Sequence, residues 1–439
     1  MRTADGGVLS SLKAQPQSSD PTWLTEARQL ALAWVVEHGF PTSKDEDWKY
    51  TQLDPIMAVP FELATLGSGG RISAEMIEKA GPDLGGLRLV FINGHFIFEL
   101  SRLGILPAGI EVTNLAAVLS AQPERIKAFF THAPGERHAF AAFNDASAKD
   151  GAFIQLAPGT CIKEPIHLIF FSESGGSPFI SNPRSVIIAG SDSCATIVES
   201  YAGIDGDIYC TNAITEIILA EGAEIEHYKV QLEPESAFHL ALLKVRQAGK
   251  SRFTSRSVAL GARIARHEVR VLLEGSRAEA TLDGIYLPEG DQVHDNMIFM
   301  DHLATNCTSH QLYKGVLDGA GRGVFNGHIM VRHGADGTDA NQKNKNLLLS
   351  DRAEADTRPR LEIYTDDVKC THGAAVGQMD EEVLLYLRAR GIPLAEARAV
   401  LIYAFIQEMV DRIELEPLRS QLEPLIAARF RKVDRPVEP

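Results

Sequence analysis

The most informative absences in this 439-residue chain concern paired cysteines, long apolar runs and positive charge. Its five cysteines lie far apart and none forms a C-x-x-C pair, which predicts reduced thiols and argues against a disulfide framework. No run approaches the roughly 20 apolar residues that span a bilayer. Residues 1–20 also lack the basic start and apolar core of a signal peptide. We therefore predict a cytoplasmic protein that binds no membrane.

The formal net charge of −15 excludes a general nucleic-acid binder, because such proteins need a basic surface to neutralise phosphate groups. Motifs of nucleotide and hydrolytic chemistry are missing as well. The triplet 249–251, Gly-Lys-Ser, resembles the end of a P-loop, but Lys244 stands where the first glycine belongs. No H-E-x-x-H and no G-x-S-x-G pattern occurs. These absences predict a chain that is not itself an enzyme.

The N-terminal part of the chain shows helical and mixed patterns. Residues 1–20 are small and polar without periodicity, so we expect a disordered tail. Apolar residues then recur at helical spacing between Pro21 and Gly39. A strand is expected over 87–94, with its hairpin partner directly after it. With a further helical pattern near 113–148, we expect an N-terminal helical, α/β region over 21–150.

Residues 151–377 contain short β-branched runs that alternate with turns, and no long helical pattern interrupts them. The turn glycines Gly222, Gly249 and Gly275 are separated by 27 and 26 residues. Near-constant spacing of strand–turn units predicts stacked coils that each pack only on their neighbours. This favours a parallel β-helix core, although a β-sandwich or jelly roll also has many short strands and stays an alternative.

Residues 378–439 are expected to form a C-terminal helical domain with three helices. The second of them, from Pro393 to about residue 413, has two apolar stripes where a surface helix normally has one. The first stripe consists of Ala397, Val400, Leu401, Ala404 and Phe405, and the second of Ile402, Ile406, Val410 and Ile413. Such a helix is buried between elements or contacts a partner. We assign Ile402, Ile406 and Val410 to partner binding.

The best local constellation for chemistry is the pair Cys370 and His372. Residues i and i+2 of a strand share one face, so a thiolate and an imidazole lie together there. This combination suits iron, zinc or an iron–sulfur cluster, with the missing ligands supplied from elsewhere in the chain or by a partner. The alternative is a buried cysteine beside an exposed histidine.

Histidines also gather late in the chain, and coils stacked on one another could combine them into a metal site. The alternative for each is a surface or hydrogen-bonded strand residue. The set is His294, His302, His310, His328, His333 and His372.

Several segments, in this order, resemble the SufB/SufD family of iron–sulfur cluster assembly proteins. They are residues 39–50 with Trp48 and Tyr50, residues 340–350, residues 359–374 with Cys370 and His372, residues 386–392 and the helical stretch 395–413. SufB-like chains carry more cysteines and a glutamate after the matching histidine. Gly373 stands there in this chain, and residues 39–50 resemble the SufD N-terminal region, so the resemblance is to the SufD-like branch.

The resemblance implies a mainly β protein: a right-handed parallel β-helix flanked by the N-terminal region and the C-terminal helical domain. It implies a non-catalytic scaffold or accessory subunit of an ATPase-driven complex. Such a subunit pairs with a SufB-like subunit through its β-helix and binds a SufC-like ABC ATPase through its C-terminal helices. Clusters form at the SufB–SufD interface, where Cys370 and His372 are the expected ligands of iron or a nascent cluster.

The resemblance also implies that iron or a cluster is held transiently in the complex, and that the isolated chain binds no cofactor tightly. Whether the chain forms a homodimer without SufB is left open. Two other functions are alternatives: a SufB-like scaffold that itself holds the cluster, and a β-helix carbohydrate-active enzyme such as a polysaccharide lyase, since a fold does not fix a function.

Overall fold

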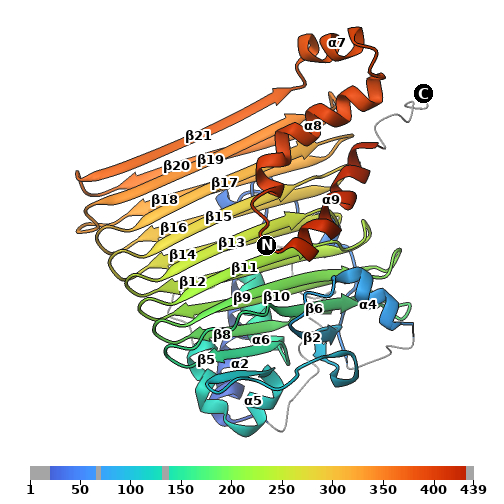
Figure 1. The fold of residues 1–439 in the computed structure, drawn as a ribbon. Coiled ribbons are helices and arrows are strands. Elements are labelled where there is room, and N and C mark those ends of the chain that lie inside the picture. Colours follow the sequence, from blue (N-terminus) through green and yellow to red (C-terminus); the bar gives the residue numbers. More distant parts are fainter. Residues whose placement is uncertain (1–19, 66–70, 131–137, 432–439) are drawn as a thin grey trace.

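The computed structural model describes residues 20–65, 71–130 and 138–431. Its centre is a stack of about eight coils, each contributing one strand to each of two parallel sheets (Figure 1). The tail predicted over 1–20 lies outside the described residues, apart from Asp20.

We call the two sheets sheet A and sheet B. Sheet A runs, in spatial order, through β20 (Glu354–Ile363), β18 (Arg322–Val331), β16 (Val293–His302), β14 (Ile264–Leu273), β12 (Phe238–Gln247), β10 (Tyr209–Leu219), β8 (Arg184–Ala189), β5 (Ala152–Leu156) and β4 (Ile110–Asn114), with β7 (Phe179–Ser181) and β1 (Glu62–Leu63) beside β10. Sheet B runs through β21 (Val368–Gln378), β19 (Thr338–Leu348), β17 (Thr308–Leu317), β15 (Glu279–Tyr286), β13 (Arg252–Ala259), β11 (Glu224–Gln231), β9 (Cys194–Gly203), β6 (Ile166–Ser172), β2 (Leu87–Ile92) and β3 (His95–Phe96).

The strand register confirms the predicted β-helix. Phe238 pairs with Ile264 and Phe153 pairs with Val186, so that residues one coil apart differ by 26 to 33 in number. This is the spacing that the turn glycines indicated. All strand pairs from β5 to β21 are parallel, which sets aside the antiparallel sandwich and jelly roll.

Inward side chains stack in rows along the helix axis, because neighbouring strands lie about 4.8 Å apart. β-branched and aromatic residues suit such a pleated, buried surface. The rings of Phe91 and Phe170, and those of Phe170 and Tyr201, stack with centroids 4.9 Å apart. One aliphatic row in the same core consists of Ile217, Val245, Val271, Met300 and Ile329.

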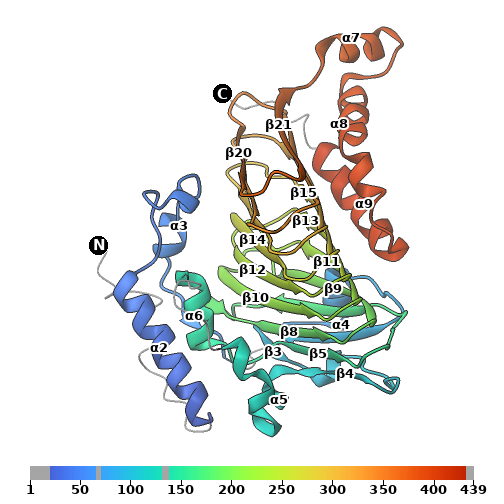
Figure 2. The ribbon, with the colours of Figure 1, turned by 90° about the vertical axis from the view of Figure 1, so that its left-hand side faces the viewer.

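Most of the N-terminal region covers the outer face of sheet A, whereas the C-terminal helices cover sheet B on the opposite side (Figure 2). Helix α4 (Ala74–Ala80) is the exception, because it packs on β6 and β9 of sheet B. The helices of the N-terminal region are α2 (Thr22–His38), η1 (Glu46–Trp48), α3 (Asp54–Met57), α4 (Ala74–Ala80), η2 (Phe98–Leu100), α5 (Leu115–Ala121), η3 (Pro123–Phe129) and α6 (Ala139–Ser147). It also extends both sheets, because β2 pairs with β6 and β4 pairs with β5. The region predicted over 21–150 is therefore continuous with the β-helix.

The segment around Trp48, which carried part of the family resemblance, lies across sheet A. The Arg266 guanidinium lies 3.8 Å from the centroid of the Trp48 ring and donates to the carbonyl of Asp47. The Thr51 hydroxyl donates to the buried carboxylate of Asp295 at 2.5 Å. These contacts give the motif a structural role, because they attach the N-terminal segment to β14 and β16.

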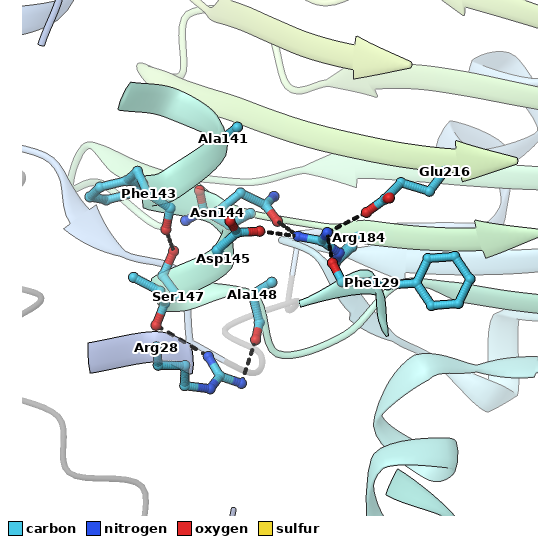
Figure 3. Close-up of polar contacts among 12 residues, drawn as sticks. Arg28, Phe129, Ala141, Phe143, Asn144, Asp145, Ser147, Ala148, Arg184 and Glu216 are labelled. Atoms are coloured by element: carbon cyan, nitrogen blue, oxygen red, sulfur yellow. Dashed lines mark hydrogen bonds and ion pairs between the residues drawn. The ribbon is translucent and has the colours of Figure 1, made fainter. Parts of the chain in front are cut away.

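Arg184 on β8 attaches the N-terminal helices to the β-helix (Figure 3). Its side chain is fully buried and pairs with Asp145 on α6 at 2.6 Å and with Glu216 on β10. The same guanidinium donates to the carbonyl of Phe129. Three elements distant in the sequence therefore meet at a single cation.

We expect Arg184→Met to destabilise the protein by about 3 to 5 kcal/mol, because removing one partner leaves buried carboxylates without a counter-charge. Arg246→Met is the matched control. Arg246 pairs with Glu274 on the surface with 60% of its side chain exposed, and such pairs contribute about 1 kcal/mol or less. Denaturant unfolding of both variants checks this, and equal loss in the two would contradict it.

The C-terminal helices are α7 (Glu381–Ala389), α8 (Leu394–Val410) and α9 (Glu416–Arg431). Helix α8 lies against β15 and β17, and the ammonium group of Lys314 donates to the Phe405 carbonyl and the Glu408 carboxylate, both at 2.8 Å. Helix α7 packs on α8 and lies beyond the last coil (Figures 1 and 2).

The prediction of five reduced thiols is wrong for one pair, because Cys161 and Cys194 form a disulfide. They are 33 residues apart in the sequence, and their Cα atoms are 4.4 Å apart. One coil of the β-helix lies between them in the sequence. Residues one coil apart lie side by side in space, so these two cysteines meet although they are far apart in the sequence.

Candidate functional site

The β-helix has an open end after its last coil. Strand β21 pairs only with β19 and β20 only with β18, so among the described residues the other edge of each has no neighbour. Unpaired N–H and C=O groups on an edge are a template for another chain. Around this end Ile363, Tyr364 and Val376 are 39%, 47% and 46% exposed. The last coil therefore presents a surface suited to a partner.

Cys370 and His372 both lie on β21, at this open end. Cys370 pairs in register with Ala340 and packs against the inner core, so its side chain faces inward. His372 has the same parity and pairs with the buried Gln342, which places its imidazole on the inner face at the mouth of the β-helix. His372 is exposed and Cys370 is half-buried. The predicted common face is thus observed, and it opens to solvent.

The two groups differ in readiness to bind a metal. Partial burial raises the pKa of the Cys370 thiol above its usual value, so the thiol is protonated at neutral pH and must lose its proton to ligate iron. His372 has no side-chain hydrogen bond or ion pair among the described residues. No described residue therefore occupies the ring nitrogen that would bind a metal.

A row of inward amides lies beneath the mouth. Gln342 donates to Gln311 at 2.9 Å. Asn344 donates to the Tyr286 hydroxyl at 2.9 Å, and that hydroxyl donates to Asn346 at 2.5 Å. Sequence reasoning used this segment only as a family motif. The sequence feature that indicates this row of amides is the period of two in residues 340–346, where inward amides alternate with outward residues such as Lys343 and Lys345.

The six late histidines do not combine into one site. His294 and His302 are buried in the interior and contact the Gly261 carbonyl and the Ser309 hydroxyl, both at 2.9 Å. His328 lies on the outer side of sheet A with Glu362 and Arg360 as its neighbours. Within the described ranges no three His, Cys, Asp or Glu side chains gather as a metal site. The described residues therefore offer no complete ligand set for a metal at His372.

The assignment of Ile402, Ile406 and Val410 to partner binding needs correction. All three side chains have no solvent exposure and pack on the outer face of sheet B. The stripe of α8 that was predicted to face a partner therefore docks the helix on its own β-helix. Sequence periodicity finds two apolar stripes but does not say which one meets the core.

Other apolar side chains of the C-terminal helices are exposed. Val400 on α8 is 52% exposed, and Leu385 and Tyr386 on α7 are 66% and 56% exposed. Val383 and Leu394 are each 41% exposed. Helices α7 and α8 pack on each other, and exposed apolar groups on such neighbouring helices can form an interaction surface. We call these five residues the helical apolar patch.

Among the described helices, none is long and apolar enough to cross a membrane.

Comparisons with known proteins cover nearly the whole chain. The SufBD core domain of the SUF system for FeS cluster assembly matches residues 170–405, and the SufBD protein N-terminal region matches residues 11–168. An iron–sulfur cluster assembly SufBD family protein of Synechocystis is 30% identical over 96% of this chain and 95% of its own length. The iron–sulfur cluster assembly protein SufD of Escherichia coli is 30% identical over 92% of both chains.

The corresponding SufD of Bacillus subtilis is 26% identical over 67% of this chain and 68% of its own length. The names of these relatives refer to iron–sulfur cluster assembly and not to the carbohydrate-active enzyme that the sequence left open. The chain therefore belongs to the SufBD family of iron–sulfur cluster assembly proteins.

Proposed function

We propose that this chain is a SufD-type, non-catalytic subunit of a cytoplasmic assembly complex that also contains a SufB-like subunit and a SufC-like ABC ATPase. The observation that carries the proposal is the open end of the β-helix. It combines two unpaired strand edges with an exposed imidazole on the inner face. A second β-helix can add its own last strands there and cover the mouth.

In this proposal iron or a nascent cluster is cargo at the junction. His372 contributes an imidazole and Cys370 a thiolate after losing its proton. The partner supplies the other ligands, in keeping with the lack of a third ligand among the described residues. Enclosing the junction between two subunits also limits the access of water and oxidants to the cargo.

Reconstitution with iron and sulfide tests the proposed function. The chain alone, the SufB-like subunit alone and the two together are compared by the visible absorption of the cluster. We expect a stable cluster in quantity only when both subunits are present. An equal yield on the isolated chain would instead make it a SufB-like scaffold that holds the cluster itself.

The helical apolar patch is the proposed contact of the ATPase subunit, in place of the buried stripe of α8. We expect Leu385→Glu and Val400→Glu together to weaken ATPase binding by about tenfold or more, since an apolar anchor of an interface typically contributes above 1 kcal/mol. Pull-down with the SufC-like subunit measures this. Leu30→Glu is the matched control, because Leu30 is a 63% exposed leucine on α2. Undiminished binding by the double variant would exclude the patch.

A further inference from the structure

The Cys161–Cys194 pair lies apart from the mouth, at the first coils of the β-helix. Cys194 begins β9, and Cys161 lies in the connection between β5 and β6. Cys161 is exposed and Cys194 is half-buried. In sheet B Cys194 pairs in register with Glu224. Glu224 belongs to a row of surface ion pairs, because Arg252 pairs with Glu224 at 2.8 Å and with Glu279 at 3.3 Å. Small water-soluble reagents can therefore reach the pair.

Main-chain contacts hold the two cysteines side by side without the sulfur–sulfur bond. The amide of Cys194 donates to the Thr160 carbonyl, and the amide of Ile162 donates to the Cys194 carbonyl, both at 3.0 Å. The amide of Gly159 donates to the Ser191 carbonyl at 2.7 Å. Ile162 is 6% exposed and belongs to the inner core. The sulfur atoms are therefore positioned to pair in both redox states.

The other three cysteines are poor competitors for a thiol reagent. Cys210 is fully buried, and desolvation raises the pKa of its thiol far above the usual range. Burial likewise raises the pKa of the Cys307 thiol, and the half-buried Cys370 at the mouth is a single thiol with no second cysteine bonded to it. Thiolates are the reactive form, so the exchange chemistry of this chain is concentrated at the Cys161–Cys194 pair.

We propose that Cys161 and Cys194 form a reversible thiol–disulfide exchange site for small thiols and disulfides. In the oxidising direction the Cys161 thiolate attacks a small disulfide and forms a mixed disulfide, and one small thiol leaves. The Cys194 thiolate then attacks the Cys161 sulfur and releases the second small thiol. The two protein thiols lose two electrons and two protons, and the small disulfide gains them. Two small thiols reverse both steps.

The test equilibrates the native full-length chain in mixtures of reduced and oxidised glutathione. Free thiols are then trapped with maleimide and located by peptide mapping. In reduced mixtures we expect maleimide to label both Cys161 and Cys194. In oxidised mixtures both labels should disappear together and the cross-linked peptide should appear, while the backbone circular dichroism stays the same. Cys161→Ser should leave Cys194 as a mixed disulfide with glutathione, and the matched control Cys307→Ser should leave the exchange unchanged.

Two results would overturn the proposal. A pair that glutathione reduces only after denaturant has been added is a structural cross-link. A pair that is labelled in every mixture and never yields the cross-linked peptide consists of two ordinary thiols.

Discussion

Replacing His372 by alanine is expected to lower iron–sulfur cluster assembly by the complete complex by about tenfold or more, in line with the usual cost of losing groups that hold a metal. In the proposed site this chain contributes the exposed His372 imidazole and the Cys370 thiol, so loss of the imidazole leaves only Cys370, whose thiol pKa partial burial raises. Cys370→Ala is expected to have a milder effect. The measurement is the rate at which the complex transfers clusters to an apo-ferredoxin.

His310→Ala is the matched control for this result. His310 is an exposed histidine of the same sheet, and its neighbour in the register, Asn341, pairs with Thr371. Its side chain therefore shares the outer face with Thr371, whereas His372 faces inward. Size-exclusion chromatography should show intact complexes for both variants. Assembly at the wild-type rate by His372→Ala would mean that all ligands come from the partner.

Placing a charge on the inner face of β21 is expected to disrupt subunit pairing. Val376 is 46% exposed at the mouth and pairs in register with the inward Asn346. In Val376→Arg the partner's last coil buries an unpaired guanidinium, which costs about 2 kcal/mol or more. The dissociation constant of the pair should rise by about thirty-fold or more, as titration calorimetry or light scattering can measure.

Ala375→Arg provides the comparison for this variant. Ala375 is the preceding residue on the same strand, is exposed and faces outward, so the same charge stays in water there. It should leave pairing nearly unchanged. If both variants paired alike, or if Val376→Arg paired like the wild type, the mouth would not be the contact between the subunits.

The β-helix was predictable from the sequence because its turns recur along the chain at a nearly constant spacing. Gly222, Gly249 and Gly275 mark successive turns, and the register reproduces their spacing. Gly222 has a φ of +72°, a conformation that few other residues adopt. The shared face of Cys370 and His372 was predictable for the same reason, since it follows from the period of two in a strand.

The rest of the site depended on distances across coils, which no local pattern records. The pairing of Cys161 with Cys194 needs the coil length at that place, and the buried polar row needs the partners of Gln342 and Asn344 on other strands. The burial of the second stripe of α8 could not be predicted for another reason. Ile402 and Val400 are both apolar, and only the direction from which sheet B approaches decides which of them is buried.

Hydrogen–deuterium exchange along β20 and β21 tests most directly whether the open end of the β-helix is the assembly interface. In the isolated chain the outer-edge amides of these strands should exchange rapidly, since each strand has a neighbour on one side only in the described part of the chain. In the complex with the SufB-like subunit we predict strong protection of residues 354–363 and 368–378. Protection confined to other parts of the chain, with β20 and β21 exchanging as fast as before, would contradict it.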